Sequence, residues 1–260
     1  MKIAVCMKQV PAYSEGNMDE KTGVLLRQGL VAISNVYDLP ALETALQIKE
    51  QTGASVAVFT MGPETAEKVI RDAYACGADS GYLISDITFA GADVLATSYT
   101  LMQAIKSTGD YDLILCGKQT TDGDTAQVSG ALAKWLEIPH INWVSRLVEV
   151  SEKYIGAEYL MGAEAVTARI TYPCLLAVEP SVFTPRMPSL KLKMQAGKRS
   201  VNRIGLTDLE DKDSGHYGLA GSATKVKKIF PPKRTQKQPV IRMDGKDSAA
   251  YIKKIVDDIM

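Results

Sequence analysis

The chain has 260 residues, of which 46% are hydrophobic, and 30 lysines and arginines balance 30 aspartates and glutamates. A chain of this length and composition can bury a full core, in one large domain with an appended arm or in two domains at most. Because nucleic-acid binding requires a basic surplus, the zero net charge argues against a nucleic-acid partner. No apolar segment reaches membrane-spanning length, so we expect a soluble, cytoplasmic protein without a membrane span.

The cysteines and histidines show no spacing that is typical of a metal site. Each cysteine lies in or beside an apolar stretch, which predicts buried free thiols in a reducing compartment. We therefore expect no bound metal ion. The residues concerned are Cys6, Cys76, Cys116, Cys174, His140 and His216.

Short apolar runs alternate with helical patterns through the first half of the chain. The apolar runs predict strands at residues 3–7, 55–60, 81–84 and 113–116. The patterns between and after them predict helices at residues 39–51, 64–76, 91–105 and 125–136. Continuous apolar strands are typical of a parallel sheet whose two faces are both covered by helices. The sequence therefore predicts an α/β fold with a doubly wound, mostly parallel sheet.

The pattern changes at residue 140. Residues 140–179 predict three or four strands with short turns, which we expect to pair as antiparallel strands at the sheet edge. From residue 180 onward, prolines interrupt any regular element until a final amphipathic helix over residues 247–260. We thus expect a nucleotide-binding α/β domain over residues 1–180. Residues 181–260 would form an arm without a core of its own, which packs against another protein.

The most informative segment, residues 117–130, follows a buried strand and opens a helix. Junctions of this kind form the ligand crevice of open α/β sheets, because free backbone amides and the helix dipole favour a phosphate there. Its glycines permit close approach of a ligand to the backbone, and Thr125 and Ser129 offer hydroxyl donors. Asp122 or Asp124 could instead cap the helix, an alternative that the sequence leaves open.

Three further loops lie at predicted junctions with helices, at residues 35–38, 61–63 and 89–97. Because loops at the carboxyl ends of parallel strands converge, we expect them to line one site with residues 117–130. The chain has no Walker loop, and no GxGxxG, GxSxG or HExxH motif. We therefore expect no catalytic residues, and any chemistry must come from a bound cofactor.

Four motifs resemble those of the electron-transfer flavoprotein beta subunit, and the resemblance extends over essentially the whole chain. They are VCMKQVP at residues 5–11, NVYDLPALE at 35–43, ACGAD at 75–79 and GKQxxDGDxxQ at 117–127. The resemblance implies a heterodimer in which the alpha subunit holds one FAD and the beta subunit covers part of it. It also implies that Cys6, residues 35–38, Met61 and residues 123–132 line the beta subunit's own nucleotide site.

Two more segments, residues 89–98 and 217–226, resemble the flavin-bifurcating branch of that family. In ordinary members the beta-subunit site holds AMP, whereas in this branch it holds a second FAD that accepts a hydride from NADH. The resemblance then implies that one electron goes to ferredoxin or flavodoxin. The other passes through the alpha-subunit FAD to an acyl-CoA dehydrogenase.

Small residues at positions 90–92 would leave room for the flavin ring, although close helix packing through Gly91 and Ala92 also explains them. Structural AMP in place of FAD remains the alternative cofactor. A homodimeric nucleotide sensor of the universal-stress type, which shares such a fold, is a third interpretation.

Residues 185–191 correspond to the family's recognition loop, which docks the dehydrogenase. We expect Leu190 to be an exposed apolar anchor, with Arg186 and Lys191 as its charged rim. The alternative is a loop stiffened by prolines whose leucine packs inward. The rest of the arm over residues 181–260 is expected to pack on the alpha subunit.

Among the candidate site residues, Lys8, Lys118 and the predicted helix start near Thr125 are expected to contact the phosphates or the ring. The full set expected to bind the cofactor is Cys6, Lys8, Asn35, Val36, Tyr37, Asp38, Met61, Ala90, Gly91, Asp93, Thr97, Lys118, Gln119, Asp122, Gly123, Asp124, Thr125, Ala126, Gln127, Val128, Ser129 and Gly130.

Overall fold

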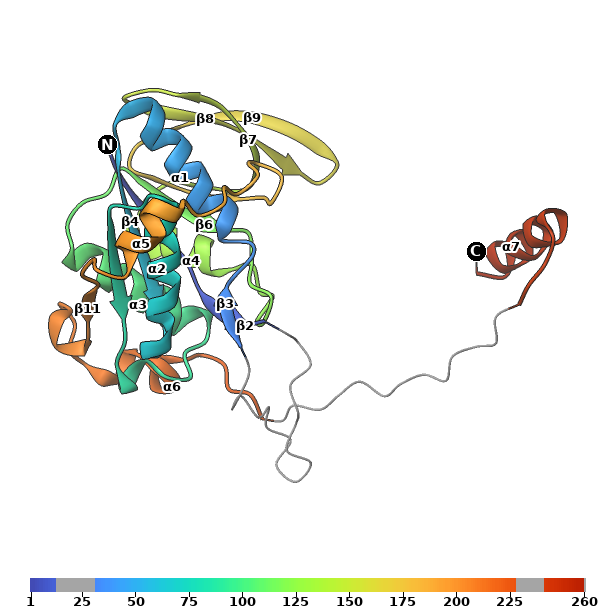
Figure 1. Cartoon of the computed structure of the whole chain (residues 1–260). Helices are drawn as coiled ribbons and strands as arrows, with labels where there is room; N and C mark the ends of the chain where they lie inside the picture. The colour runs from blue at the N-terminus through green and yellow to red at the C-terminus, as the bar shows by residue number, and fades with distance from the viewer. Residues whose placement is uncertain (13–30, 228–240, 260) are drawn as a thin grey trace. The chain divides into compact units, whose positions relative to one another are not determined.

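The computed structural model describes residues 1–12, 31–227 and 241–259. The chain forms two compact units, Met1–Lys227 and Lys228–Met260, which are described separately below (Figure 1). The first unit runs beyond the boundary expected at residue 180, because a later segment adds a strand to its sheet.

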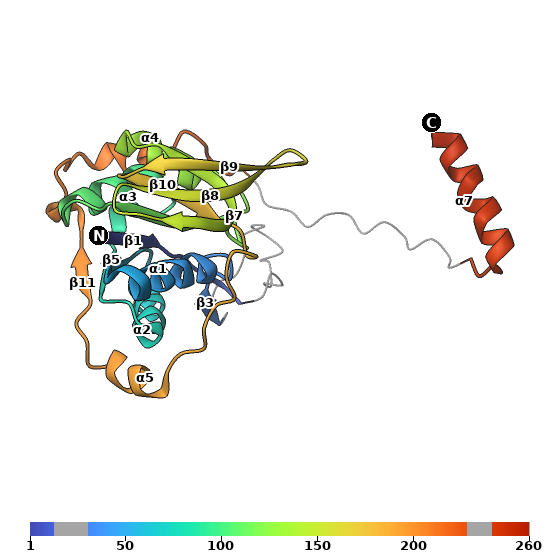
Figure 2. The same cartoon turned by 90° about the horizontal axis from the view of Figure 1, so that it is seen from above.

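A nine-stranded sheet forms the centre of the first unit. Its strands are β1 (Lys2–Cys6), β4 (Ser55–Met61), β5 (Ser80–Ile84), β6 (Leu113–Gly117), β7 (His140–Val150), β8 (Tyr154–Met161), β9 (Glu164–Thr171), β10 (Cys174–Val178) and β11 (Asn202–Ile204). Their order in space is β11-β5-β4-β1-β6-β10-β7-β8-β9. β11 forms one edge of the sheet, and β7, β8 and β9 lie toward the other edge (Figure 2). Neighbours from β11 to β7 pair in parallel, whereas β7, β8 and β9 are antiparallel.

Helices cover both faces of the parallel part of the sheet. α1 (Leu39–Thr52) and α2 (Glu67–Cys76) pack on one face, and α3 (Val94–Ser107) and α4 (Val128–Leu136) pack on the other. Side chains of β1 alternate between the two cores: Val5 joins the core under α1 and α2, and Ala4 the core under α3 and α4. Because both faces are buried, the strands are continuous apolar runs. The predicted doubly wound α/β fold is confirmed.

Two local predictions are wrong. β10 was expected to join the antiparallel strands at the edge, but it lies between β6 and β7 and pairs with both in parallel. All five of its residues are buried, as expected for a central strand. In addition, the helix predicted to begin at residue 125 begins at Val128 as α4.

Residues 180–227 hold regular elements that the sequence did not predict. They are α5 (Leu190–Ala196), β11, the 3-10 turns η3 (Leu206–Asp208) and η4 (Ser214–His216), and α6 (Gly218–Gly221). α5 packs on α2, where Nη1 of Arg71 donates to the carbonyl of Ala196 at 2.6 Å. α6 contacts the 3-10 turn η2 (Ile87–Phe89), which follows β5. It therefore lies at the carboxyl edge of the sheet (Figure 1).

The second unit contains α7 (Gly245–Ile259), close to the range expected for the final helix. Its apolar side chains recur at helical spacing, and Ile252, Ile255 and Val256 are not covered within that unit. Among the described residues, no helix combines the length and the apolar character that crossing a membrane requires.

The contact between β5 and α2 gives a test of the fold. Gly81 lies so close to α2 that an added β-carbon would meet Cγ2 of Ile70 at 2.1 Å. Gly81→Ala should therefore lower the free energy of unfolding by about 1–3 kcal/mol, measured by chemical denaturation. Adding Ile70→Ala should cost less than the sum of the two single changes, because the clash is then removed.

Gly197→Ala is the matched control. An added β-carbon at this position meets no atom within 4 Å, and the backbone is already right-handed helical. We expect this change to be neutral or to stabilise the protein by less than about 1 kcal/mol. Equal losses from Gly81→Ala and Gly197→Ala would contradict the packing of α2 on β5.

Candidate functional site

The predicted nucleotide loops lie at the carboxyl ends of β4, β1 and β6. From β1 the chain passes through α1 to β4 on one side. β6 pairs with the other side of β1 and is followed by α4, on the opposite face of the sheet. The connections therefore diverge between β1 and β6. Open α/β sheets bind their ligands at such a switch point.

Asn35 joins two of the predicted loops. Its side chain is fully buried, and Nδ2 donates to the carbonyl of Gln119 at 2.8 Å. Its Oδ1 accepts a longer bond of 3.4 Å from the amide of Thr121. The short hairpin of β2 (Gln9–Pro11) and β3 (Ala32–Ser34) delivers Asn35 to this position. The segments around residues 35 and 120 thus converge, as the sequence predicted.

Asp38 occupies the N-cap position of α1 but does not cap the helix with its side chain. Instead, its buried Oδ2 accepts a hydrogen bond of 2.8 Å from the backbone amide of Lys8. Burial raises the pKa of this carboxyl to about 7, and the bond from Lys8 only partly offsets that effect. The carboxyl at the floor of the site therefore keeps its proton at pH values where an exposed aspartate is ionised.

Gly117, at the end of β6, permits the start of α1 to approach this strand closely. A β-carbon there would lie 2.3 Å from the carbonyl oxygen of Tyr37 and 2.4 Å from Oδ1 of Asp38. Both contacts are too short for any side chain, so only glycine lets β6 meet the start of α1. Neighbouring Val36 is exposed, whereas Tyr37 is half-buried.

Lys8 and Asp122 form an ion pair at the mouth of the site. Nζ of Lys8 lies 2.7 Å from Oδ2 of Asp122, and both side chains are partly exposed. Burial opposes ionisation of Asp122, but the bonds from Lys8 and from the Gly123 amide outweigh it and lower its pKa. The Lys8 ammonium therefore belongs to the predicted loop, where an anionic ligand could share it.

The segment before α4 has an unusual backbone. Asp124 has φ 49° and Ala126 has φ 53°, left-handed values that are uncommon for residues with a side chain. Gln119 donates from Nε2 to Oδ1 of Asp124 at 2.6 Å, which fixes the turn. The N-cap of α4 is Gln127, without a side-chain cap, so neither Asp122 nor Asp124 caps the helix.

The amides at the start of α4 have no acceptor among the residues that the structure describes. Within the described part of the chain, the backbone amides of residues 125–130 donate to no protein acceptor. These amides surround Val128, the first helical residue, and Thr125 in the exposed turn before it. Together with the helix dipole they form a positive site that an anion can satisfy.

Three residues predicted to bind the cofactor contact other parts of the protein instead. They are Lys118, Ser129 and Gly130. Nζ of Lys118 pairs with Glu179 at 2.9 Å and lies 5.9 Å from the centre of the Trp143 ring. Oγ of Ser129 donates to Oδ1 of Asn142 at 3.1 Å. An added β-carbon at Gly130 would approach Nε2 of His140, on β7. These residues therefore contact β7 and Glu179, which directly follows β10, and the sequence pattern alone did not distinguish them from Lys8.

Two of the remaining predicted residues lie at strand ends. Cys6 is buried at the end of β1, where it is in register with Cys116 of β6, and Met61 is half-buried at the end of β4. The hydrogen bond with Cys6 and burial raise the pKa of the Cys116 thiol. Cys116 is therefore an unreactive thiol below the loops.

The loop after β5 forms a separate cluster with residues 217–226. Asp93 caps α3, since its Oδ1 accepts from the Ala96 amide at 3.1 Å. Its Oδ2 accepts from the amide and the hydroxyl of Thr224 at 2.8 and 2.9 Å. The amide of Leu219 donates to the carbonyl of Ala90 at 2.9 Å. The two segments singled out in the sequence therefore bind each other.

Gly91 lies inside this second cluster. It has φ 74°, and an added β-carbon would lie 3.3 Å from Cβ of Leu219. Its small size thus serves the packing of α6, which is the alternative considered for these residues. Thr97 lies one turn into α3, half-buried, and its amide donates to the carbonyl of Asp93.

Residues 185–191 were expected to present Leu190 between the charged side chains of Arg186 and Lys191. Leu190 and Lys191 are exposed, so the inward-packed alternative for Leu190 is wrong. Arg186 does not form a rim, because its guanidinium donates to Glu43 and Glu50 of α1. Glu43 was missed in the sequence analysis. The signal that could have identified Glu43 is an acidic residue among the buried positions of α1.

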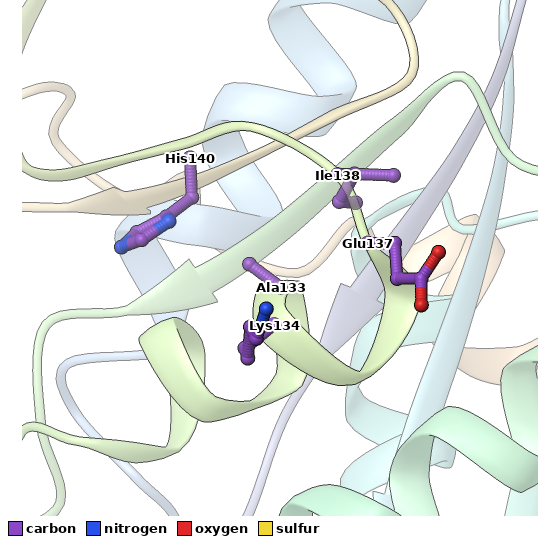
Figure 3. Close-up of a pocket in the computed structure, with 5 residues that line it drawn as sticks. All are labelled: Ala133, Lys134, Glu137, Ile138 and His140. Atoms are coloured by element: carbon purple, nitrogen blue, oxygen red, sulfur yellow. The ribbon is translucent and has the colours of Figure 1, made fainter.

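A cavity of about 410 Å³ lies at the other end of α4. It is lined by Ala133, Lys134, Glu137, Ile138 and His140 (Figure 3). Figure 3 shows the carboxylate of Glu137 and the imidazole of His140 at opposite ends of this group. Because the cavity adjoins the carboxyl end of α4, it is separate from the free amides at the helix start.

Known proteins with similar sequences were found over almost the whole chain. The profile of the electron transfer flavoprotein domain matches residues 22–209. The chain is 33% identical to an electron transfer flavoprotein subunit beta of Megasphaera elsdenii, over 100% of this chain and 98% of that protein. It is 36% identical to the protein FixA of Sinorhizobium fredii, over 96% and 89% of the two chains. It is 38% identical to subunit CarD of the caffeyl-CoA reductase-Etf complex of Acetobacterium woodii, over 89% and 88%.

The buried Asp38 carboxyl predicts a pH dependence of stability. Its pKa is raised from 3.8 to about 7 in the folded protein, so between these values the unfolded chain ionises while the folded one keeps its proton. The free energy of unfolding should therefore fall as pH rises through this window, by up to about 1.4 kcal/mol per pH unit. Asp38→Asn should remove this decline, measured by urea denaturation from pH 5 to pH 8.

Asp110→Asn serves as the control, because Asp110 is exposed in the loop before β6. It should keep the wild-type pH profile. An Asp38→Asn profile parallel to that of the wild type would show that the carboxyl at the floor of the site is already ionised at low pH.

Proposed function

The chain belongs to the electron transfer flavoprotein family, as a member of its beta subunit and FixA branch, and we propose that its loops bind FAD. In this proposal the chain forms a heterodimer with an alpha subunit that carries a second FAD. The proposed activity is the oxidation of NADH, with electron bifurcation between a low-potential carrier and an acyl-CoA dehydrogenase. α7 and its apolar side chains would pack on the alpha subunit.

One observation carries the proposal of a bound dinucleotide: the amides at the start of α4 find no acceptor in the described part of the chain. Left-handed residues such as Asp124 and Ala126 turn neighbouring amides into an anion-binding concavity. The dipole of α4 adds positive potential, and the Lys8 ammonium, paired with Asp122, supplies a cation in the same loop. These groups fit a diphosphate. The chain would thus hold the cofactor mainly through its backbone.

The width of the sheet edge supports FAD over AMP. The two clusters of loops lie at the ends of β6 and β5, which are three strand spacings apart in the sheet, roughly 14 Å. A dinucleotide can reach both clusters, whereas a mononucleotide occupies only one. The small residues at 90–92 do not add to this support, because Leu219 packs against Gly91. AMP at the α4 end alone is the second candidate.

A bound FAD would supply the acceptor for a hydride from NADH and the outlets for single electrons to ferredoxin or flavodoxin and to the alpha-subunit FAD. The chain's own residues would bind and orient it. Burial raises the pKa of Asp38 to about 7, so below that pH its carboxyl is mostly protonated and repels the diphosphate less than an ordinary aspartate would. The relative from Acetobacterium woodii is named for a complex with a caffeyl-CoA reductase, which supports an acyl-CoA dehydrogenase as partner here.

The cofactor assignment is tested on the purified heterodimer with its alpha subunit. We expect two flavins per heterodimer and bleaching of the flavin absorbance on addition of NADH without oxygen. One flavin together with acid-extractable AMP, and no bleaching by NADH, would assign the site to AMP instead. A homodimer without flavin colour would favour a nucleotide sensor.

The position of the site is tested by Asp124→Ala combined with Thr125→Ala. Alanine fits φ 49° less well than aspartate, and the change also removes the bond to Gln119 and a hydroxyl donor. We expect the beta-subunit nucleotide to be lost, so that about one flavin per heterodimer remains. Asp110→Ala is the control, because Asp110 lies before β6 at the opposite edge of the sheet. This variant should retain both flavins. Unchanged nucleotide content in the double variant would place the site elsewhere.

A further inference from the structure

Arg186 is directed into the protein, although it belongs to a loop with highly exposed neighbours. Its Nε and Nη2 donate to Oε2 and Oε1 of Glu43 at 2.8 and 2.9 Å, a two-pronged pair. Its backbone amide also donates to Oε2 of Glu43, at 3.1 Å. Nη1 donates to Glu50 at 2.6 Å. All three side-chain bonds therefore end on α1.

Glu43 is almost completely buried, with 4% of its side chain exposed. Burial opposes its ionisation, but the bonds from Arg186 and from Gln47 outweigh that effect and lower its pKa. A buried carboxylate without a partner is strongly unfavourable, so the pair with Arg186 is maintained. Arg186 in turn has most of its donors occupied. It is unsuited to a second partner, unlike a rim residue.

The ion pair fixes the segment that leads into α5. Three residues after Arg186, the amide of Ser189 donates to the carbonyl of Ala75, at 3.1 Å. Three apolar side chains in and after this segment are exposed. Met187 is 87% exposed, Leu190 76% and Met194 72%. The loop thus has an inner side that is bonded through Arg186 and Ser189, and an outer side that is apolar.

We propose that Glu43 and Arg186 are positioning residues, whose buried ion pair holds residues 185–189 on α1 and so presents Met187, Leu190 and Met194 to the dehydrogenase. This inference rests on the proposed function. Lys191 and Lys193 are exposed beside the apolar side chains and are in no ion pair among the described residues. The surface therefore fits a partner with an apolar pocket and an acidic rim.

A fixed loop binds better because its ordering is complete before the partner arrives. A free loop would lose backbone and side-chain freedom on docking, which weakens the affinity. Methionine side chains adapt to irregular pockets, and a leucine between them gives a defined anchor. Glu43 and Arg186 contact neither the partner nor a nucleotide in this arrangement. They act through the position of Leu190.

The first experiment measures the anchoring itself by hydrogen exchange of the full heterodimer. The Ser189 amide is the reporter, because its bond to Ala75 depends on the position of the loop. Arg186→Met and Glu43→Gln should each raise its exchange rate about tenfold or more. Arg146→Met, which breaks an ion pair between Arg146 of β7 and Glu158 of β8, is the matched control and should leave the rate unchanged. Unchanged exchange in both loop variants would overturn the proposal.

The second experiment measures reduction of the acyl-CoA dehydrogenase purified from the same cells. Arg186→Met should raise the KM for the dehydrogenase about tenfold, with flavin content and NADH oxidation by an artificial acceptor unchanged. Leu190→Ala should do the same, and the double variant should be little worse than either single one, because Arg186 acts through Leu190. Additive effects, or a normal KM with a loosened loop, would overturn the positioning role.

Arg186→Lys keeps the charge but loses the two-pronged bond, and it should give intermediate values in both experiments. If Arg186→Met does not fold, Arg186→Lys and Glu43→Gln decide the question. A wild-type heterodimer that oxidises NADH but reduces no dehydrogenase would refute the partner assignment under the proposed function. The exchange rates would still show whether the ion pair holds the loop.

Discussion

The carboxyl group of Asp38 is the point at which three segments of the first unit meet. It lies at the start of α1, receives the Lys8 amide after β1, and faces Gly117 at the end of β6. Desolvation makes a charge there costly, so the group is neutral at the lower end of the physiological range. The loops of the candidate site are built outward from this contact. Asn35 extends it to the segment around Gln119, and Lys8 extends it to Asp122.

α1 links the two functional regions that the structure suggests. Its first turn belongs to the candidate nucleotide loops through Asp38, and its next turns hold residues 185–189 through Glu43 and Glu50. Each region therefore depends on the placement of one helix. The helix is well fixed, with an apolar face in the core and a left-handed Gly53 closing its end. A single rigid element positions both the proposed cofactor site and the proposed docking surface.

Periodicity in the sequence was sufficient to predict the fold class, because the central strands are apolar throughout and the helices carry one buried stripe. It could not place β10, since the position of a strand in a sheet depends on pairing with distant segments. The start of α4 was missed for a different reason. Asp124 and Thr125 are ordinary capping residues, and the left-handed conformations that delay the helix leave no mark on residue type. For the site, the convergence around Asn35 and Asp38 was predictable from strand ends. The inward direction of Arg186 and Lys118 was not, because a charged side chain does not reveal its partner.

Gly117, at the end of β6, limits which substitutions this protein can accept during evolution. Any side chain at position 117 would meet the peptide group of Tyr37, and no substitution at Tyr37 can relieve a collision with its main chain. A second mutation therefore cannot compensate for a substitution at position 117. Exposed Val36 and Thr125 have no such restriction, so sequence drift around the cofactor loops should accumulate on the rim while their floor stays fixed.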